Sequence, residues 1–126
     1  MPVSCRWDET ESNLIIFRFE GRWTWDEWTA ADGEWHRLVN SHPSVVTTLL
    51  DFRAGRRPPP NLGLHMQNIA RENHPKRGMV LIVGNDPVLN VIGKAMLSLF
   101  PMAGRRVRIF STQEEARDFY RARVMS

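Results

Sequence analysis

The sequence predicts an α/β domain built on one mixed β-sheet, and three observations support this. Strand-like and helix-like segments alternate from residue 44 onward, a pattern that favours right-handed crossovers between parallel strands. Two short strand-like segments precede the first helix and predict an antiparallel hairpin. The segment 44–52 is nearly continuous in apolar or threonine residues, as expected of a central strand covered on both faces, and 78–84 is another buried strand. The predicted order is β-β-α-β-α-β-α-β-α, in a single domain over residues 1–126.

The first third of the chain supplies the hairpin and one helix. A short strand from Val3 to Trp7 is expected to pair across the turn "DETESN" with the segment 14–20, "LIIFRFE", which ends in apolar and polar alternation. Thr24 and Glu27 form a capping-box pattern at a helix start. The helix should continue to about residue 41, with these apolar positions on one face: Trp28, Ala31, Trp35, Leu38 and Val39.

Three strands and three helices are predicted in the remainder. The strands are 44–52, 78–84 and 105–110. A second helix begins near Leu62, and Asp86-Pro87 opens a third helix that runs to Phe100. A second capping box, Ser111 with Glu114, should begin the last helix. The residues that mark the inner faces of the second and last helices are Leu62, Met66, Ile69, Ala70, Ala116, Phe119 and Tyr120.

Two segments resemble the STAS-like (SpoIIAA-like) family, small domains related to bacterial anti-sigma-factor antagonists. They are "FEGRWTWDEW" and "PVLNVIGKAMLSLFPMAGRRVRIFSTQEEARDFYRAR", and the resemblance covers about residues 13–122. It implies a STAS/SpoIIAA-like fold, a bacterial signalling setting and a regulatory role. Classical antagonists open the second helix with "DSSGL", whose second serine is phosphorylated. The matching segment here is "PNLGL", with Leu62 at that position, so the resemblance implies control by binding rather than by phosphorylation there.

The stretch "LLDFRAGRRPPPNLGLH" carries most of the predicted site. It follows the central strand, and open α/β sheets bind ligands at the carboxyl ends of their strands. Cations, a helix start and an amide at this rim would suit an anion or an acidic partner. The alternative is that Asp51 pairs with Arg53 in a solvated corner that the prolines hold extended. The candidate ligand- or partner-binding residues are Asp51, Arg53, Arg56, Arg57, Asn61, Leu62, Gly63, His65, Asn85 and Asp86.

Two apolar features lie elsewhere in the chain. Trp28 and Trp35 fit a core-facing stripe, whereas Trp23 and Trp25 flank the helix cap, so at least one of them is expected to be partly exposed. The helix 87–100 is apolar nearly all round. This pattern predicts either a homodimer contact or burial beneath a neighbouring helix.

Several function classes find little support in the composition. Cys5 is the only cysteine, so no internal disulfide forms, and no signal peptide or membrane-span pattern is present; a cytoplasmic chain is expected. The histidines show no metal-ligand spacing, and no cofactor motif is found. The formal net charge is +3 and the basic residues fall on opposite rims of the predicted sheet, which argues against nucleic-acid binding. An enzyme using Asp51 and His65 is the weakest hypothesis.

The sequence therefore predicts a non-enzymatic STAS-like regulatory or protein-binding module without the phosphoacceptor serine. Its expected partner is another protein or a second copy of the chain. The alternative is a carrier of a small acidic or amphipathic ligand, held in a pocket near residues 51–65.

Overall fold

The structure, a computed structural model, describes residues 2–55, 59–61, 64–65, 68, 74–87, 89–90, 94 and 106–125. Several predictions fall on the other residues. They are the inner face of the second helix, most of the helix predicted to reach Phe100 with its homodimer surface, and the site residues Arg56, Arg57, Leu62 and Gly63.

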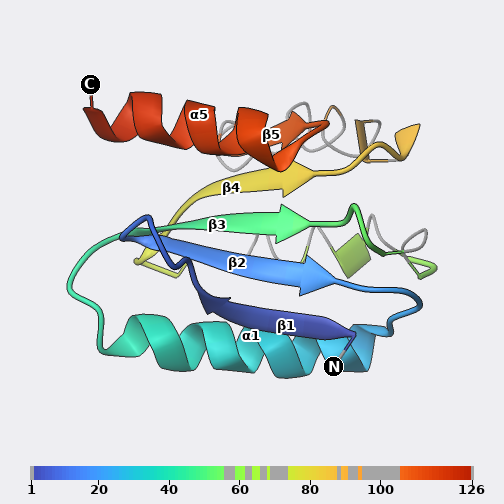
Figure 1. The fold of residues 1–126 in the computed structure, drawn as a ribbon. Helices are drawn as coiled ribbons and strands as arrows, with labels where there is room; N and C mark the ends of the chain where they lie inside the picture. The colour runs from blue at the N-terminus through green and yellow to red at the C-terminus, as the bar shows by residue number, and fades with distance from the viewer. Residues whose placement is uncertain are drawn as a thin grey trace.

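A five-stranded mixed sheet forms the centre of the molecule (Figure 1). Its strands lie side by side in chain order: β1 (Val3–Trp7), β2 (Leu14–Phe19), β3 (Val46–Asp51), β4 (Arg77–Val83) and β5 (Val107–Phe110). β1 pairs with β2 antiparallel, and every later neighbouring pair is parallel. The α/β fold class, the N-terminal hairpin and the parallel strands after it are confirmed.

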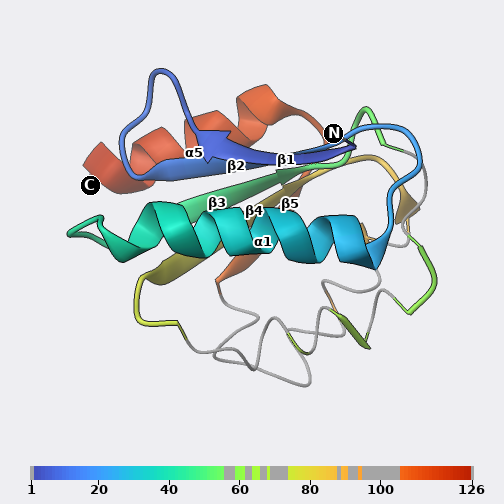
Figure 2. The same ribbon diagram turned by 90° about the horizontal axis from the view of Figure 1, so that it is seen from below.

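Two helices cover opposite faces of this sheet, as Figure 2 shows: α1 (Trp25–Asn40) and α5 (Gln113–Met125). The capping box predicted for α1 is present, because the Thr24 side chain accepts a hydrogen bond from the Glu27 backbone and the Glu27 side chain accepts one from the Thr24 backbone. None of the helices in the described part of the chain has the length and apolar character to cross a membrane.

The core on the α1 face is rich in aromatic residues. Trp28 and Trp35 are buried as the helical spacing predicts, and they pack with Phe17 and Phe19 of β2. The indole Nε1 of Trp35 donates to the Thr48 hydroxyl at 3.0 Å, so the one polar atom of this fully buried ring is satisfied. Each of these rings removes a large apolar area from water, and this is the main stabilisation of the α1 layer.

The core on the α5 face is smaller. Ala116 and Tyr120 are buried there against apolar side chains of the three central strands, and Phe119 is partly buried, as predicted. The predicted capping box of α5 is wrong by one residue: Thr112, not Ser111, accepts the hydrogen bond, from the backbone of Glu115 at 3.1 Å. The sequence "STQEEA" offers a hydroxyl and an acid three residues apart in both registers, so the pattern alone does not choose between them.

Cations at the amino-terminal ends of the strands stabilise α1. The Lys76 ammonium donates to the carbonyl oxygens of Val39 and Asn40 at 2.8 and 3.3 Å, at the negative end of the helix dipole. The Arg77 guanidinium lies 4.0 Å from the ring centroid of Trp35 and 3.5 Å from the Asp32 carboxylate. These contacts join the start of β4 to the last turns of α1.

Candidate binding cleft

Asp51, the last residue of β3, has a buried carboxylate that forms an ion pair with the half-exposed Arg53. Its side chain is on the α5 face, with only 7% of it exposed. The Arg53 guanidinium donates from Nε and Nη2 to the two carboxylate oxygens, at 3.0 and 2.8 Å, and the Arg53 backbone donates as well. Gln113, the first residue of α5, donates from Nε2 to Oδ2 at 3.1 Å. The predicted pairing of Asp51 with Arg53 is therefore present.

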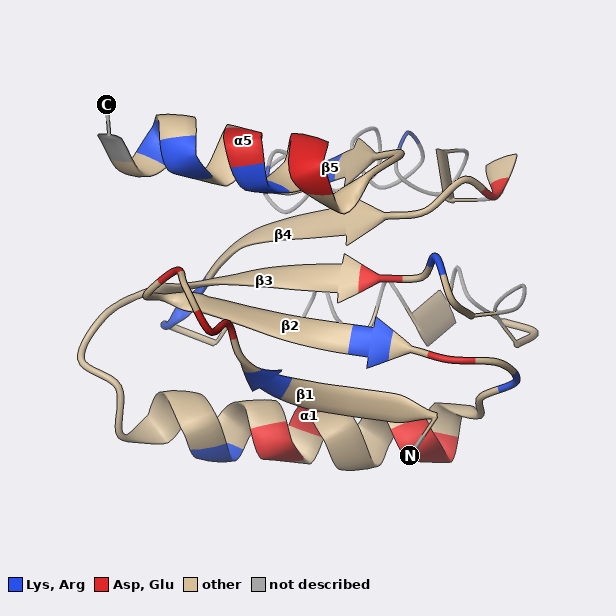
Figure 3. Cartoon of the chain, viewed as in Figure 1, with Lys and Arg blue, Asp and Glu red and all other residues tan. Residues whose placement is uncertain are grey.

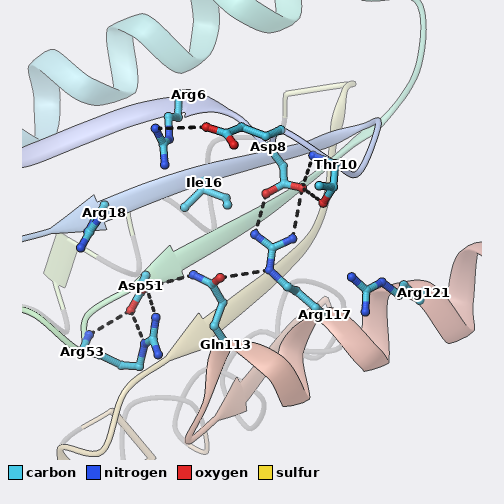
Figure 4. A pocket seen from close by; sticks show the side chains of 11 residues that line it. Arg6, Asp8, Thr10, Ile16, Arg18, Asp51, Arg53, Gln113, Arg117 and Arg121 are labelled. Carbon is cyan, nitrogen blue, oxygen red and sulfur yellow. Dashed lines mark hydrogen bonds and ion pairs between the residues drawn. The ribbon is translucent and has the colours of Figure 1, made fainter.

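Gln113 extends this pair into a chain of hydrogen bonds that crosses the face of the sheet (Figure 4). Its Oε1 accepts from Arg117 Nε at 3.0 Å. Arg117 in turn donates from Nη1 and Nη2 to the Asp8 carboxylate, at 3.1 and 2.6 Å. Asp8 also accepts from the backbone and hydroxyl of Thr10 in the β1–β2 turn. This series of hydrogen bonds thus links the end of β3, one face of α5 and the hairpin.

The space beside these hydrogen-bonded side chains is a polar cleft of about 460 Å³. One wall is formed by β1 and β2, on the face of the sheet that carries α5. The other wall is formed by polar residues of α5 that recur at every fourth position. Among the described residues that line it, five are arginines and three are acids. The lining residues are Arg6, Asp8, Glu9, Thr10, Ile16, Arg18, Asp51, Arg53, Gln113, Arg117 and Arg121.

Two of the five arginines in the cleft are fixed by hydrogen bonds, and the other three are more exposed. Arg53 is 45% exposed but donates from Nε and Nη2 to Asp51. Arg117 is 18% exposed and all three of its guanidinium nitrogens donate, so it is fixed in place. The side chains of Arg6, Arg18 and Arg121 are 64%, 54% and 50% exposed, and their acidic partners lie at the mouth of the cleft or outside its lining. Exposed ion pairs such as Arg6–Glu9 and Arg18–Glu20 contribute between nothing and about 1 kcal/mol, so these two guanidinium groups can exchange partners at little cost. The Glu11 partner of Arg121 is only 22% exposed, and its pair with Arg121 is more firmly held.

The buried acids of the cleft are held in the ionised form. Hydrogen bonds from Arg117 lower the pKa of Asp8 far below its ordinary range, although burial opposes them. Burial raises the pKa of Asp51, but the hydrogen bonds from Arg53 and Gln113 outweigh burial and leave it below the usual value. At neutral pH both carboxylates are therefore poorly suited to donate or accept protons as catalytic groups.

His65, another predicted site residue, lies on the opposite face of the sheet. His65 stacks on Trp25 with ring centroids 3.9 Å apart, and the Trp25 indole donates to the Pro60 carbonyl at 2.7 Å. Trp25 belongs to α1 and packs against the aromatic core, whereas Asp51 bonds to α5. The hypothesis of a catalytic Asp51–His65 pair is wrong, because the sheet separates the two side chains. Trp25 is the half-buried cap tryptophan, while Trp23 is buried.

The remaining described candidates surround the strand ends. Asn61 is exposed and has a φ of 70°, in the left-handed region that asparagine tolerates well. Asn85 is exposed and Asp86 is half-buried, directly after β4. The structure thus places Asp51 and Arg53 in the cleft and His65 on the α1 face, so these residues of the predicted rim do not form one site.

Sequence reasoning missed most of the cleft. It did not single out Arg6, Asp8, Arg18, Gln113, Arg117 or Arg121. Two signals were available: the spacing of Gln113, Arg117 and Arg121 places them on one stripe of a helix, and Arg18 interrupts an otherwise buried strand. Only the pairing of Asp8 with Arg117, which are 109 residues apart, could have shown that the two elements face each other.

No family model and no curated protein matches this sequence. Its structure, however, is similar to the crystal structure of an uncharacterised protein of the DUF3478 family, described as having a SpoIIAA-like fold, from Shewanella loihica PV-4. The TM-score is 0.64 with 11% sequence identity, and the alignment covers 93% of this chain and 90% of that one. An identity this low supports the fold and not the activity. The chain has a SpoIIAA-like α/β fold.

Proposed function

We propose that this chain is a non-enzymatic regulatory module that binds a protein partner in the arginine-lined cleft. The observation that carries the proposal is the part of the α5 face that no described residue covers, where exposed guanidinium groups surround a concave surface that runs from the ends of β2 and β3 to the β1–β2 turn. One end of this cleft lies at the carboxyl ends of the strands, where open α/β sheets bind their ligands. The buried carboxylates support a binding role, since their arginine partners keep them from acting as acids or bases.

Site-directed photocrosslinking in cells tests this proposal. Ser4 is exposed on β1 and pairs in register with Arg18, so p-benzoylphenylalanine at position 4 would face the cleft. Ala30 is exposed on α1, on the other face of the sheet, and provides the matched control. We expect a discrete protein adduct from position 4 that Arg18→Gln weakens, and none of that mass from position 30. The same adducts from both positions, or no adduct from position 4, would contradict the proposal.

A second candidate is a carrier of a small acidic ligand. The cleft volume of about 460 Å³ falls in the range of small-molecule sites, and its arginines suit carboxylates. Native mass spectrometry of gently purified protein distinguishes the two candidates. A carrier would show a stoichiometric added mass that Arg18→Gln removes, whereas a protein-binding module would show the bare chain mass.

A further inference from the structure

We propose that the cleft recognises a short, extended acidic segment of the partner, about four residues long with acidic side chains at alternate positions. This inference rests on the proposed function and names the chemistry of the partner. It follows from the shape of the two walls and from the distribution of charge between them.

The first wall offers two arginines whose backbone positions have a defined separation. Arg6 pairs in register with Ile16, and Arg18 lies two residues further along the same strand, so the two arginines are diagonal neighbours on adjacent strands. Such neighbours are about 7–8 Å apart. In an extended peptide, side chains two residues apart point to the same side at about 7 Å. The spacing of the arginines therefore matches acidic residues at alternate positions.

The second wall determines the length of the peptide segment that fits the cleft. The polar stripe of α5 runs from Gln113 to Arg121, and eight residues of helix rise about 12 Å. An extended chain covers this distance with about four residues. Figure 4 shows the arginines spread along the cleft from Arg53 at one end to Arg121 at the other, rather than gathered around one point. A compact anion would meet only one end of this array.

The charge of the cleft favours carboxylates over a nucleic-acid backbone. Asp8 and Asp51 are buried in their own ion pairs, but Glu9 is exposed at the mouth, with 83% of its side chain accessible. Acidic and basic segments are interspersed over the described parts of the molecule (Figure 3). A long polyanion would pass Glu9 at the mouth of the cleft, whereas a segment of four residues meets the exposed Arg6, Arg18 and Arg121.

Fluorescence anisotropy measures the proposed recognition. The probe is a labelled heptapeptide in which three glutamates alternate with glycines, and the control peptide carries glutamines instead. The test variant is Arg6→Gln/Arg18→Gln. Its matched control is Arg37→Gln, which changes an arginine that is 70% exposed on α1, across the sheet. Urea unfolding of both variants checks that they remain folded.

The glutamate peptide should bind the wild type and the Arg37→Gln variant with Kd values within about two-fold of each other. The double variant and the glutamine peptide should each weaken binding about ten-fold or more, because each removes the charge-assisted contacts. Binding that also becomes weaker with rising salt would support the same conclusion.

Three outcomes would overturn the inference: equal binding of the glutamine peptide, equal binding by the folded double variant, or stronger arginine-dependent binding of citrate or of a single-stranded oligonucleotide. If photocrosslinking at position 4 succeeds while the glutamate peptide fails, the module binds a protein by other chemistry and the proposed function stands. If both fail, the cleft is not a protein-binding site.

Discussion

The buried carboxylate of Asp8 connects two parts of the chain that are far apart in the sequence. Its side chain is only 5% exposed, and it is held by Arg117 and by the turn that joins β1 to β2. The pKa of Asp8 is lowered on folding, so the stabilisation that it supplies is present above its unfolded pKa of about 4 and is lost as the pH falls through the folded value.

Asp8→Asn should therefore destabilise the protein in a pH-dependent way. At pH 7 we expect the free energy of unfolding to fall by about 3 kcal/mol, as for other broken buried ion pairs. The difference between variant and wild type should shrink below about pH 4, where the wild-type contribution declines. Urea unfolding of both proteins at pH 7, 5 and 3 measures this difference in the free energy of unfolding. A difference that stays constant over this range would show that the charge of Asp8 is not the cause.

At the scale of single elements, the start of α5 positions one wall of the cleft. Its first residue, Gln113, contacts both Asp51 and Arg117, and the N-cap hydroxyl belongs to Thr112. Since a shift of one residue in the cap would turn Gln113 away from Asp51, the register of this helix start and the hydrogen-bond chain support each other.

Two alanine substitutions distinguish the two possible caps. Thr112→Ala should lower the free energy of unfolding by about 1 kcal/mol, because it removes the hydroxyl that accepts from the Glu115 backbone. Ser111→Ala should change it by less than about 0.5 kcal/mol. Thermal or urea unfolding of both variants gives the comparison. If Ser111→Ala is the more damaging change, the capping box predicted from the sequence is the correct one.

The elements that sequence predicts well are those with a strong local signal. The capping box at Thr24, the helical spacing of Trp28 and Trp35, and the apolar run of β3 each depend on residues close in sequence, and each is confirmed. The cleft depends on contacts between the hairpin and α5, which no local pattern contains. Asp51 and Arg53 were predicted because they follow a parallel strand, but Arg117 had no such marker.

At the scale of the whole molecule, Cys5 reports on global unfolding. It lies in β1 beside α1, and burial, together with the charges of Glu34 and Asp32, raises the pKa of its thiol to about 12. The reactive species is the thiolate, and the raised pKa leaves very little of it in the folded protein at pH 8. The SpoIIAA-like fold thus holds this side chain in a nearly unreactive state.

Labelling of Cys5 by a thiol reagent should therefore be slow in native buffer at pH 8. The rate should rise with urea along the same transition as tryptophan fluorescence, because unfolding returns the thiol to its ordinary pKa. Asp118→Asn changes a side chain that is 68% exposed on α5, across the sheet from Cys5, and serves as a control for substitution itself. Fast labelling well before the fluorescence transition would mean that β1 separates from the sheet on its own.

The ion pair between Asp8 and Arg117 also has a consequence for how the chain folds. Arg121 with Glu11, and Tyr120 with the Ser12 carbonyl, repeat the same link between residues more than 100 positions apart. Such distant contacts form slowly, since a large loop must close before they are gained. During synthesis the hairpin is made before α5, and the acids of the hairpin remain unpaired until α5 has been made. The second wall of the cleft is thus added only after all five strands of the sheet have been synthesised.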